Sequence, residues 1–109
     1  MISPSITDSH CHLDFDDFNE NLKETVENAR RSGVRRMVTI CTRLKDEPNV
    51  RRIAEKFESV LYAAGTHPMN AHKEPMINVS DLLEVSKHSK FIGIGETGLD
   101  YYYTKETEE

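Results

Sequence analysis

Residues 29–40 read Ala29-Arg30-Arg31-Ser32-Gly33-Val34-Arg35-Arg36-Met37-Val38-Thr39-Ile40. This stretch joins two kinds of predicted secondary structure without a linker. Apolar residues recur at helical spacing before it, and Gly33 is typical of the residue that ends a helix in a left-handed conformation. The run from residue 34 to 42 is rich in β-branched and apolar residues, which indicates a strand. The segment therefore predicts a helix followed directly by a strand, the repeating step of an α/β fold.

The same alternation extends in both directions from this junction. Asp46-Glu47-Pro48 is typical of a helix start, and Asn78 with Asp81 three residues later predicts another. The predicted elements are a strand beginning at 5–9, a helix at about 19–32, a strand at 34–42, a helix from 46, a strand at 60–65, a helix from 78 and a strand at 90–95. Strand centres recur about every 30 residues, as in βα units, so we expect about four parallel strands and three helices.

Polar residues at the predicted strand ends distinguish between two parallel architectures. His10 and His12 end the first strand, His67 follows the third and Glu96 follows the fourth, so all should lie at one carboxyl edge. Active sites of (β/α)8 TIM barrels lie at that edge, whereas an open sheet with a nucleotide site would need a Gly-rich phosphate loop. A barrel takes roughly 250 residues. We therefore expect residues 1–109 to form a single half-barrel segment, incomplete at its C-terminus.

Composition limits the classes of protein that fit. A net charge of −5 gives no general attraction to a polyanion, so nucleic-acid binding would need a local site or a metal. We expect no membrane span and no signal peptide, and hence a cytoplasmic protein. Cys11 and Cys41 have neither CxxC spacing nor the density of a disulfide scaffold, so we expect reduced thiols that serve packing.

His10 and His12 are separated by one residue, which on a strand places both imidazoles on one face. On a helix the same spacing would make them diverge. From spacing alone, two partly buried structural histidines are about as probable as a pair of metal ligands. Glu96 follows Gly93 and Gly95, where small residues permit close backbone approach, and a carboxylate can span two cations. Together these residues suggest a metal-dependent hydrolase.

Three motifs carry a specific resemblance, namely residues 8–15 (Asp-Ser-His-Cys-His-Leu-Asp-Phe), 65–68 (Gly-Thr-His-Pro) and 93–102 (Gly-Ile-Gly-Glu-Thr-Gly-Leu-Asp-Tyr-Tyr). In this order and spacing the chain resembles the TatD family of metal-dependent deoxyribonucleases, within the amidohydrolase superfamily. The resemblance covers about residues 6–103. It implies a (β/α)8 barrel that hydrolyses phosphodiester bonds of DNA with two divalent ions, such as Mg, Mn or Zn.

The resemblance also implies individual roles. His10 and His12 bind one metal, and Glu96 bridges the pair and is the catalytic carboxylate. The family's remaining ligands, two histidines and an aspartate, come from later strands and would lie beyond Glu109. Met69 departs from the family pattern, in which many relatives have a second histidine after His-Pro.

Other polar residues have weaker signals. His67 precedes Pro68, which restricts its backbone, so a substrate-phosphate or outer-shell role competes with a plain loop histidine. Asp100 and Tyr101 are candidate substrate contacts, although consecutive aromatics more often pack a loop onto the fold. Asp8 shares strand parity with the two histidines and could orient a ligand. His72 and His88 have no such context and are expected at the surface.

Two interpretations remain open at this stage. In one, the chain is the N-terminal part of a hydrolase acting on DNA or, within the superfamily, on another ester or an amide. In the other, it is a non-catalytic barrel fragment that binds metal weakly or associates with a partner. In both, an open half-barrel should expose an apolar inner face and an unpaired strand edge, so self-association is expected.

Overall fold

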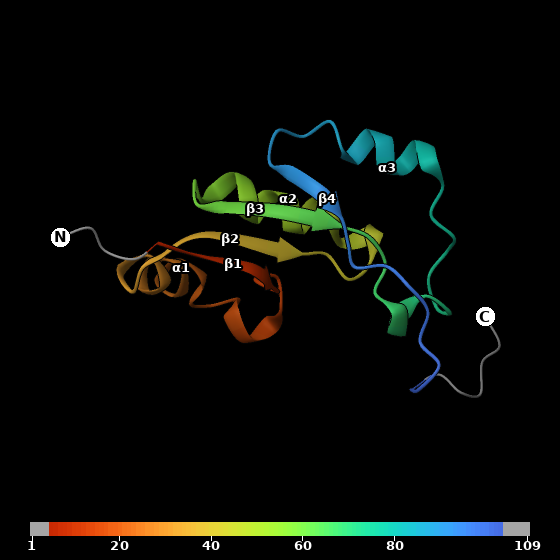
Figure 1. Cartoon of the computed structure of the whole chain (residues 1–109), viewed down its shortest axis with the longest axis horizontal. Helices are drawn as coiled ribbons and strands as arrows, with labels where there is room; N and C mark the ends of the chain where they lie inside the picture. The colour runs from red at the N-terminus through yellow and green to blue at the C-terminus, as the bar shows by residue number, and fades with distance from the viewer. Residues whose placement is uncertain (1–4, 104–109) are drawn as a thin grey trace.

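The computed structural model describes residues 5–103, and its centre is a parallel β-sheet (Figure 1). The strands are β1 (Ile6–Cys11), β2 (Val34–Ile40), β3 (Val60–Ala64) and β4 (Phe91–Ile94). They lie in the order β1-β2-β3-β4, and each neighbouring pair is parallel. The predicted α/β class with four parallel strands is therefore confirmed. Because all strands run the same way, their carboxyl ends meet at one edge of the sheet.

Three α-helices connect the strands: α1 (Leu22–Arg31), α2 (Glu47–Lys56) and α3 (Val79–Val85). Short 3-10 turns η1 (Asp16–Phe18), η2 (Leu44–Asp46) and η3 (Pro68–Asn70) follow the first three strands. Helix α1 begins three residues later than expected, because η1 and a turn precede it. No helix in the described part of the chain has the length and apolar character needed to cross a membrane.

Backbone hydrogen bonds explain the helix end predicted at Gly33 and the helix start predicted at Asn78. Gly33 has a φ of 103°, and its N–H bonds to the carbonyl of Arg30, so a glycine is required where α1 ends. At the start of α3 the Asn78 side chain accepts a hydrogen bond from the N–H of Asp81 at 2.9 Å. The sequence prediction of both termini is confirmed.

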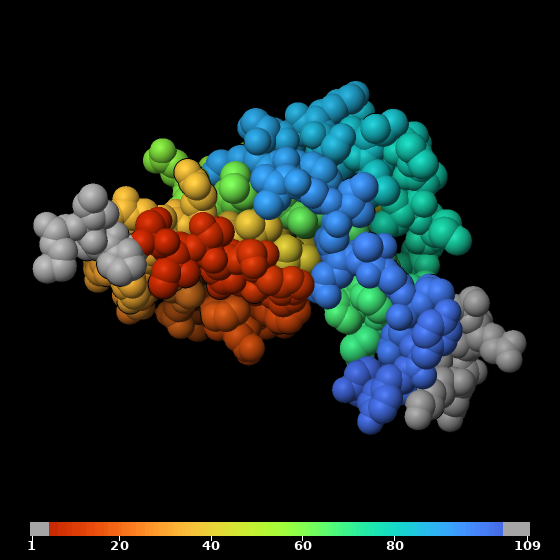
Figure 2. Space-filling view, viewed as in Figure 1, coloured from red at the N-terminus to blue at the C-terminus, as the bar shows by residue number. Residues whose placement is uncertain are grey.

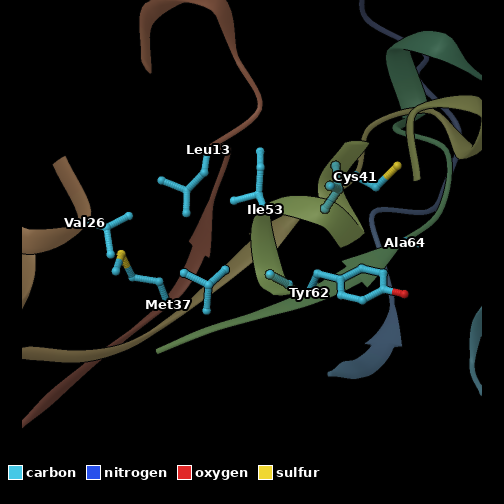
Figure 3. Packing of buried hydrophobic residues seen from close by; sticks show 10 residues of the cluster. Leu13, Val26, Met37, Cys41, Ile53, Tyr62 and Ala64 are labelled. Atoms are coloured by element: carbon cyan, nitrogen blue, oxygen red, sulfur yellow. The ribbon is translucent and has the colours of Figure 1, made fainter. Parts of the chain in front are cut away.

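The main core lies between the sheet and helices α1 and α2 (Figure 3). Alternate residues of the central strands point into it, so Met37 of β2 and Tyr62 of β3 are both buried. Tyr62 is fully buried and packs edge-on against Phe91 of β4, with ring centroids 5.7 Å apart. The other buried members are Leu13, Val26, Cys41, Val50, Ile53, Ala54, Val60 and Ala64.

A smaller apolar cluster lies on the opposite face of the sheet. Val38, Ile40 and Ala63 form this cluster and are shielded. Toward the two edge strands, Ile6 and Ile92 are each 54% exposed. Within residues 5–103, β1 and β4 each pair on one side alone. Within these residues the sheet therefore has two unpaired edges, and each edge strand carries an exposed isoleucine.

A local irregularity in β1 shapes its carboxyl end. Asp8 pairs with Met37 and Cys11 with Thr39, so β1 advances three residues while β2 advances two. Such a bulge re-aims the side chains beside it. Asp8 Oδ1 accepts a hydrogen bond from the backbone N–H of His10 at 3.1 Å. Asp8 thus supports the bulged backbone, and simple strand parity does not describe its relation to His10.

Candidate metal centre

His10 and His12 lie together at the carboxyl end of β1. Their ring centroids are 5.0 Å apart and the ring planes are nearly perpendicular, at 82°. His12 also stacks on Phe15 with centroids 4.5 Å apart and planes within 9° of parallel. The Phe15 ring therefore fixes the plane of the His12 imidazole, while His10 is the more exposed of the two.

Glu96, which follows β4, reaches these histidines across the end of the sheet. Its Oε2 lies 3.4 Å from Nε2 of His10 and 3.7 Å from Nε2 of His12. One candidate ligand atom from each of the three residues lies within 4.8 Å of the others. Two imidazoles and a carboxylate with convergent donors are a ligand set suited to borderline divalent ions.

The hydrogen bond of His12 tests whether this set fits a cation. Nδ1 of His12 lies 3.0 Å from the carbonyl oxygen of Ile40. Because a carbonyl can only accept, Nδ1 must carry the proton, and the neutral ring then has its lone pair on Nε2. Nε2 is the atom that faces Glu96. Such a bond from the far nitrogen is the usual way in which proteins orient a metal-binding histidine, so the residues present fit a divalent cation.

His67 joins the same group from the loop after β3. Its Nε2 lies 3.3 Å from Oε1 of Glu96, the carboxylate oxygen that does not face His10 and His12. Its ring Nδ1 accepts a hydrogen bond from the backbone N–H of Met69 at 3.0 Å. The backbone N–H of His67 donates to the carbonyl of Thr42 at 2.8 Å. The sequence suggested a substrate contact here, but the direct approach to Glu96 emerges only in three dimensions.

Gly65 at the end of β3 allows Glu96 to occupy its position. A Cβ added to Gly65 would collide with the backbone carbonyl of Glu96 and lie 3.1 Å from the carbonyl carbon of Gly95. The N–H of Gly95 bonds to the carbonyl of Ala64 at 3.1 Å, and the Gly95–Glu96 peptide is cis. Sequence reasoning missed Gly65 as a site residue, although its place at a strand end was a usable signal.

Asp100 and Tyr101 lie in the segment after Glu96, which stands out from the body of the molecule (Figure 2). The Asp100 carboxylate accepts hydrogen bonds from the backbone N–H groups of Tyr102 and Tyr103, at 3.0 and 3.1 Å. Tyr101 is 76% exposed. Asp100 therefore shapes its own turn, and the Tyr101 ring is available to a molecule that approaches this edge.

The cysteines beside the site are unpaired thiols. Burial raises the pKa of Cys11 to about 12, and burial raises the pKa of Cys41 to about 11. Thiols with such values are largely un-ionised near neutral pH and poor nucleophiles. Both have the packing role expected from the sequence.

His88 lies apart from this site, and the expectation of a surface histidine there is wrong. Its Nδ1 accepts a hydrogen bond from the N–H of Lys90 at 3.1 Å, its Nε2 lies 3.3 Å from Glu55, and its ring packs edge-on against Tyr62. The side chain is 24% exposed. His88 joins the turn before β4 to α2, which short-range sequence context did not indicate.

The parallel sheet and the His/Glu group at its carboxyl edge fit one portion of a TIM barrel with a candidate metal site, and comparison with known proteins specifies the family. The family described as TatD related DNase matches residues 7–109. The crystal structure of YjjV, a TatD homologue from Escherichia coli K12, superposes with a TM-score of 0.81 at 25% identity, over 92% of this chain and 39% of that one. The chain belongs to the TatD family.

Curated relatives agree with this assignment. The metal-dependent hydrolase YcfH of Escherichia coli K12, itself uncharacterized, is 36% identical over 107 residues, which cover 94% of this chain and 39% of the relative. An uncharacterized metal-dependent hydrolase of Buchnera aphidicola is 32% identical, covering 95% and 43%. A putative deoxyribonuclease of Mus musculus, TATDN3, is 28% identical, covering 88% and 36%. The chain thus spans well under half the length of the relatives it matches.

Proposed function

We propose that this chain is the N-terminal half-barrel of a metal-dependent hydrolase that cleaves phosphodiester bonds of DNA. The observation that carries the proposal is the convergence of His10, His12 and Glu96 at the carboxyl edge of the sheet. Membership of the TatD family and the name of the mouse relative support DNA as the substrate class. The proposal includes a cytoplasmic location, which the unpaired thiols of Cys11 and Cys41 support.

His10, His12 and Glu96 would hold divalent cations, Mg, Mn or Zn, with Glu96 as the catalytic carboxylate. A bound pair of ions would supply an activated water and neutralise the charge of the phosphodiester. Hydrolysis of a phosphodiester would add water to phosphorus and break one P–O ester bond, leaving a phosphomonoester and a hydroxyl group. His12 is oriented for this role by Phe15 and the Ile40 carbonyl.

The two oxygens of Glu96 point to different partners. Oε2 faces the histidine pair and Oε1 faces Nε2 of His67, so the two oxygens of the carboxylate meet imidazoles from different strands. We assign His67 to the substrate phosphate, and the exposed Tyr101 ring with the Asp100 turn to the flanking nucleotide. Stacking of a base on an aromatic ring tolerates any sequence, which suits a nuclease without sequence preference.

Three protein ligands leave much of a cation's coordination to water, so binding to this chain should be weak. Titration calorimetry with Zn²⁺ and Mn²⁺ tests the site. We expect Glu96→Gln to weaken binding at least about tenfold, the effect of losing one ligand contribution of about 1.4 kcal/mol or more. Glu84→Gln is the matched control, since Glu84 is an exposed helix carboxylate paired with Lys87. Equal affinity of the two variants would reject the metal site.

Nuclease activity is a separate measurement. The chain should be assayed on single-stranded and duplex DNA with each ion, alone and together with a chain that supplies the remaining strands of the barrel. We expect hydrolysis in the complemented sample and its loss in His12→Ala. Cleavage of a carboxylic ester but not of DNA by the complemented sample would redirect the proposal to ester or amide hydrolysis within the superfamily.

A second candidate function is association without catalysis. It is favoured by the two unpaired sheet edges and by the exposure of Ile6, Ile92 and Ile94, which are 54, 54 and 59% exposed. Unpaired edges with apolar side chains are templates for another chain. A half-barrel that associates with a second copy or another partner would bury these groups whether or not it hydrolyses DNA.

A further inference from the structure

The rings of His12 and His67 both approach Glu96 through Nε2, but their other nitrogens meet opposite partners. Nδ1 of His12 faces the carbonyl oxygen of Ile40, which can only accept a hydrogen bond. Nδ1 of His67 faces the N–H of Met69, which can only donate. A neutral imidazole has one N–H and one lone pair, so these contacts determine the state of the distal Nε2 in each ring.

For His12 the proton is on Nδ1 and the lone pair is on Nε2, as a cation requires. For His67 the lone pair is on Nδ1, and the proton is on Nε2, 3.3 Å from Oε1 of Glu96. An Nε2 that carries a proton cannot donate electrons to a metal. The same atom is well suited to donate a hydrogen bond to a negatively charged oxygen.

The backbone around His67 makes this arrangement rigid. The backbone N–H of His67 donates a hydrogen bond to the carbonyl of Thr42 at 2.8 Å. The backbone carbonyl of His67 accepts one from the N–H of Asn70, also at 2.8 Å. Pro68 begins the η3 turn, which brings the Met69 amide back onto the His67 ring. The donor to Nδ1 is therefore a backbone group that cannot rotate away, unlike a hydroxyl or a water molecule.

We propose that His67 is held in the tautomer opposite to that of His12, so that it is an oxyanion donor and not a third imidazole ligand of the metal centre. Its Nε2–H holds Oε1 of Glu96 in the free protein and is offered to an anionic phosphate oxygen beside the cation. The choice of phosphate as the anion rests on the proposed function, whereas the tautomer does not. The Met69 amide acts through the ring and is a positioning group.

Nitrogen NMR of the unmodified chain, labelled with ¹⁵N-histidine, tests the tautomers directly. The measurement compares the two ring nitrogens of each neutral imidazole, of which one carries a proton and the other a lone pair. We expect a protonated Nε2 and a bare Nδ1 for His67, and the reverse for His12. A protonated Nδ1 in His67 overturns the proposal. Addition of Zn²⁺ should shift the Nε2 resonance of His12 strongly and leave the Nε2–H of His67 in place, and deprotonation of His67 Nε2 by Zn²⁺ would equally overturn it.

Dimethyl phosphate, an anionic phosphodiester, is the probe for the donor role, and neutral trimethyl phosphate is its control. We expect the first to shift the His67 Nε2–H resonance and the second to leave it unchanged. Met69→Pro removes the amide that selects the tautomer, while Met69→Ala retains it. The proline variant should show mixed His67 tautomers and about fivefold weaker dimethyl phosphate binding, the equivalent of one hydrogen bond. The alanine variant should match the parent.

These readings separate the inference from the proposed function. Correct tautomers without metal-dependent DNA hydrolysis would remove the nuclease assignment and keep His67 as an anion donor. DNA hydrolysis with His67 in the His12-like tautomer would keep the nuclease and reject the donor role. If Met69→Pro fails to fold, the spectra of the unmodified chain decide the question alone.

Discussion

Gly65 lies directly against the backbone carbonyl of Glu96, so the end of β3 and the segment after β4 meet where a side chain cannot fit. The relationship connects the fold to the candidate site, because Glu96 is the residue that approaches His10, His12 and His67 together. The carboxylate of Glu96 can therefore occupy its place only if residue 65 is a glycine.

Gly65→Ala should displace the Glu96 backbone and weaken Zn²⁺ binding at least about tenfold, since a ligand moved out of reach is equivalent to a ligand lost. Gly93→Ala is the control, because a Cβ there meets no atom within 4 Å. Calorimetry of both variants, with circular dichroism to verify the fold, makes the comparison. Equal Zn²⁺ affinities of the two variants would show that the backbone of Glu96 can shift without weakening metal binding.

Tyr62 and Glu47 form a buried polar pair between β3 and α2. The Tyr62 hydroxyl donates to Oε2 of Glu47 at 3.1 Å, and Glu47 is 4% exposed. Tyr62→Phe removes the donor and leaves a buried carboxylate oxygen short of a partner, which should lower the free energy of unfolding by about 1–3 kcal/mol. Denaturant titration measures it. Tyr103→Phe, at a side chain 70% exposed, should change stability by less than about 0.5 kcal/mol.

Stability should fall in alkaline solution because the two thiols ionise more readily in the unfolded chain. Burial raises the pKa of Cys11 from 9.0 to about 12 and that of Cys41 from 9.0 to about 11. Above pH 9 the unfolded state therefore binds fewer protons than the folded state, and the free energy of unfolding decreases as pH rises from 9, up to about 11 for Cys41 and about 12 for Cys11. Below pH 9 this contribution is fully present.

Replacing Cys41 by alanine should make that alkaline decrease shallower by up to about 1.4 kcal/mol per pH unit, the value for one proton. Urea titrations at pH 8, 9 and 10 compare the slopes, and the absolute stability at pH 8 serves as the reference for the change in packing. An unchanged slope would mean that the Cys41 thiol ionises at its ordinary pKa in the folded chain.

Lys90 stabilises the end of α2 from the start of β4. Its ammonium donates to the carbonyls of Ala54 and Phe57, each at 2.6 Å, and to that of Val60 at 3.0 Å. The Ala54 carbonyl lies in the last turn of α2, where carbonyls lack intrahelical partners, and the Phe57 carbonyl also accepts from the N–H of Val60. Lys90→Met retains the aliphatic stem and removes the donors, so we expect a loss of about 1–3 kcal/mol in thermal or denaturant unfolding. Lys87→Met, on an exposed side chain paired with Glu84, should be nearly neutral.

Self-association through the unpaired edges is measured by sedimentation. We expect the chain to form dimers or larger species at high concentration, because Ile6 and Ile92 expose apolar surface beside open strands. Ile92→Lys should shift the equilibrium toward monomer, while Val79→Lys, at an exposed position of α3, should leave it unchanged. A compact, stable monomer at all concentrations would count against this surface as an interface.

Much of the fold was determined by local sequence. Gly33 ends α1 because only a residue without a side chain adopts its φ of 103° easily, and Asn78 begins α3 by accepting from the Asp81 amide. The spacing of His10 and His12 and the location of Glu96 after a strand placed all three at one edge of the sheet, and the resemblance of three motifs to the TatD family nominated them as ligands. The helix ends and the strand ends each depend on residues within a few positions of one another, so a sequence pattern can reveal them.

Tertiary structure alone decided the contacts that give the cluster its chemistry. The Ile40 carbonyl that sets the proton of His12, the approach of His67 to Glu96 and the fit of Gly65 against the Glu96 backbone all join separate βα units. So does the approach of the His88 ring to Glu55 of α2. No local pattern encodes them, because they exist only when parallel strands from distant parts of the chain bring their carboxyl ends to one edge.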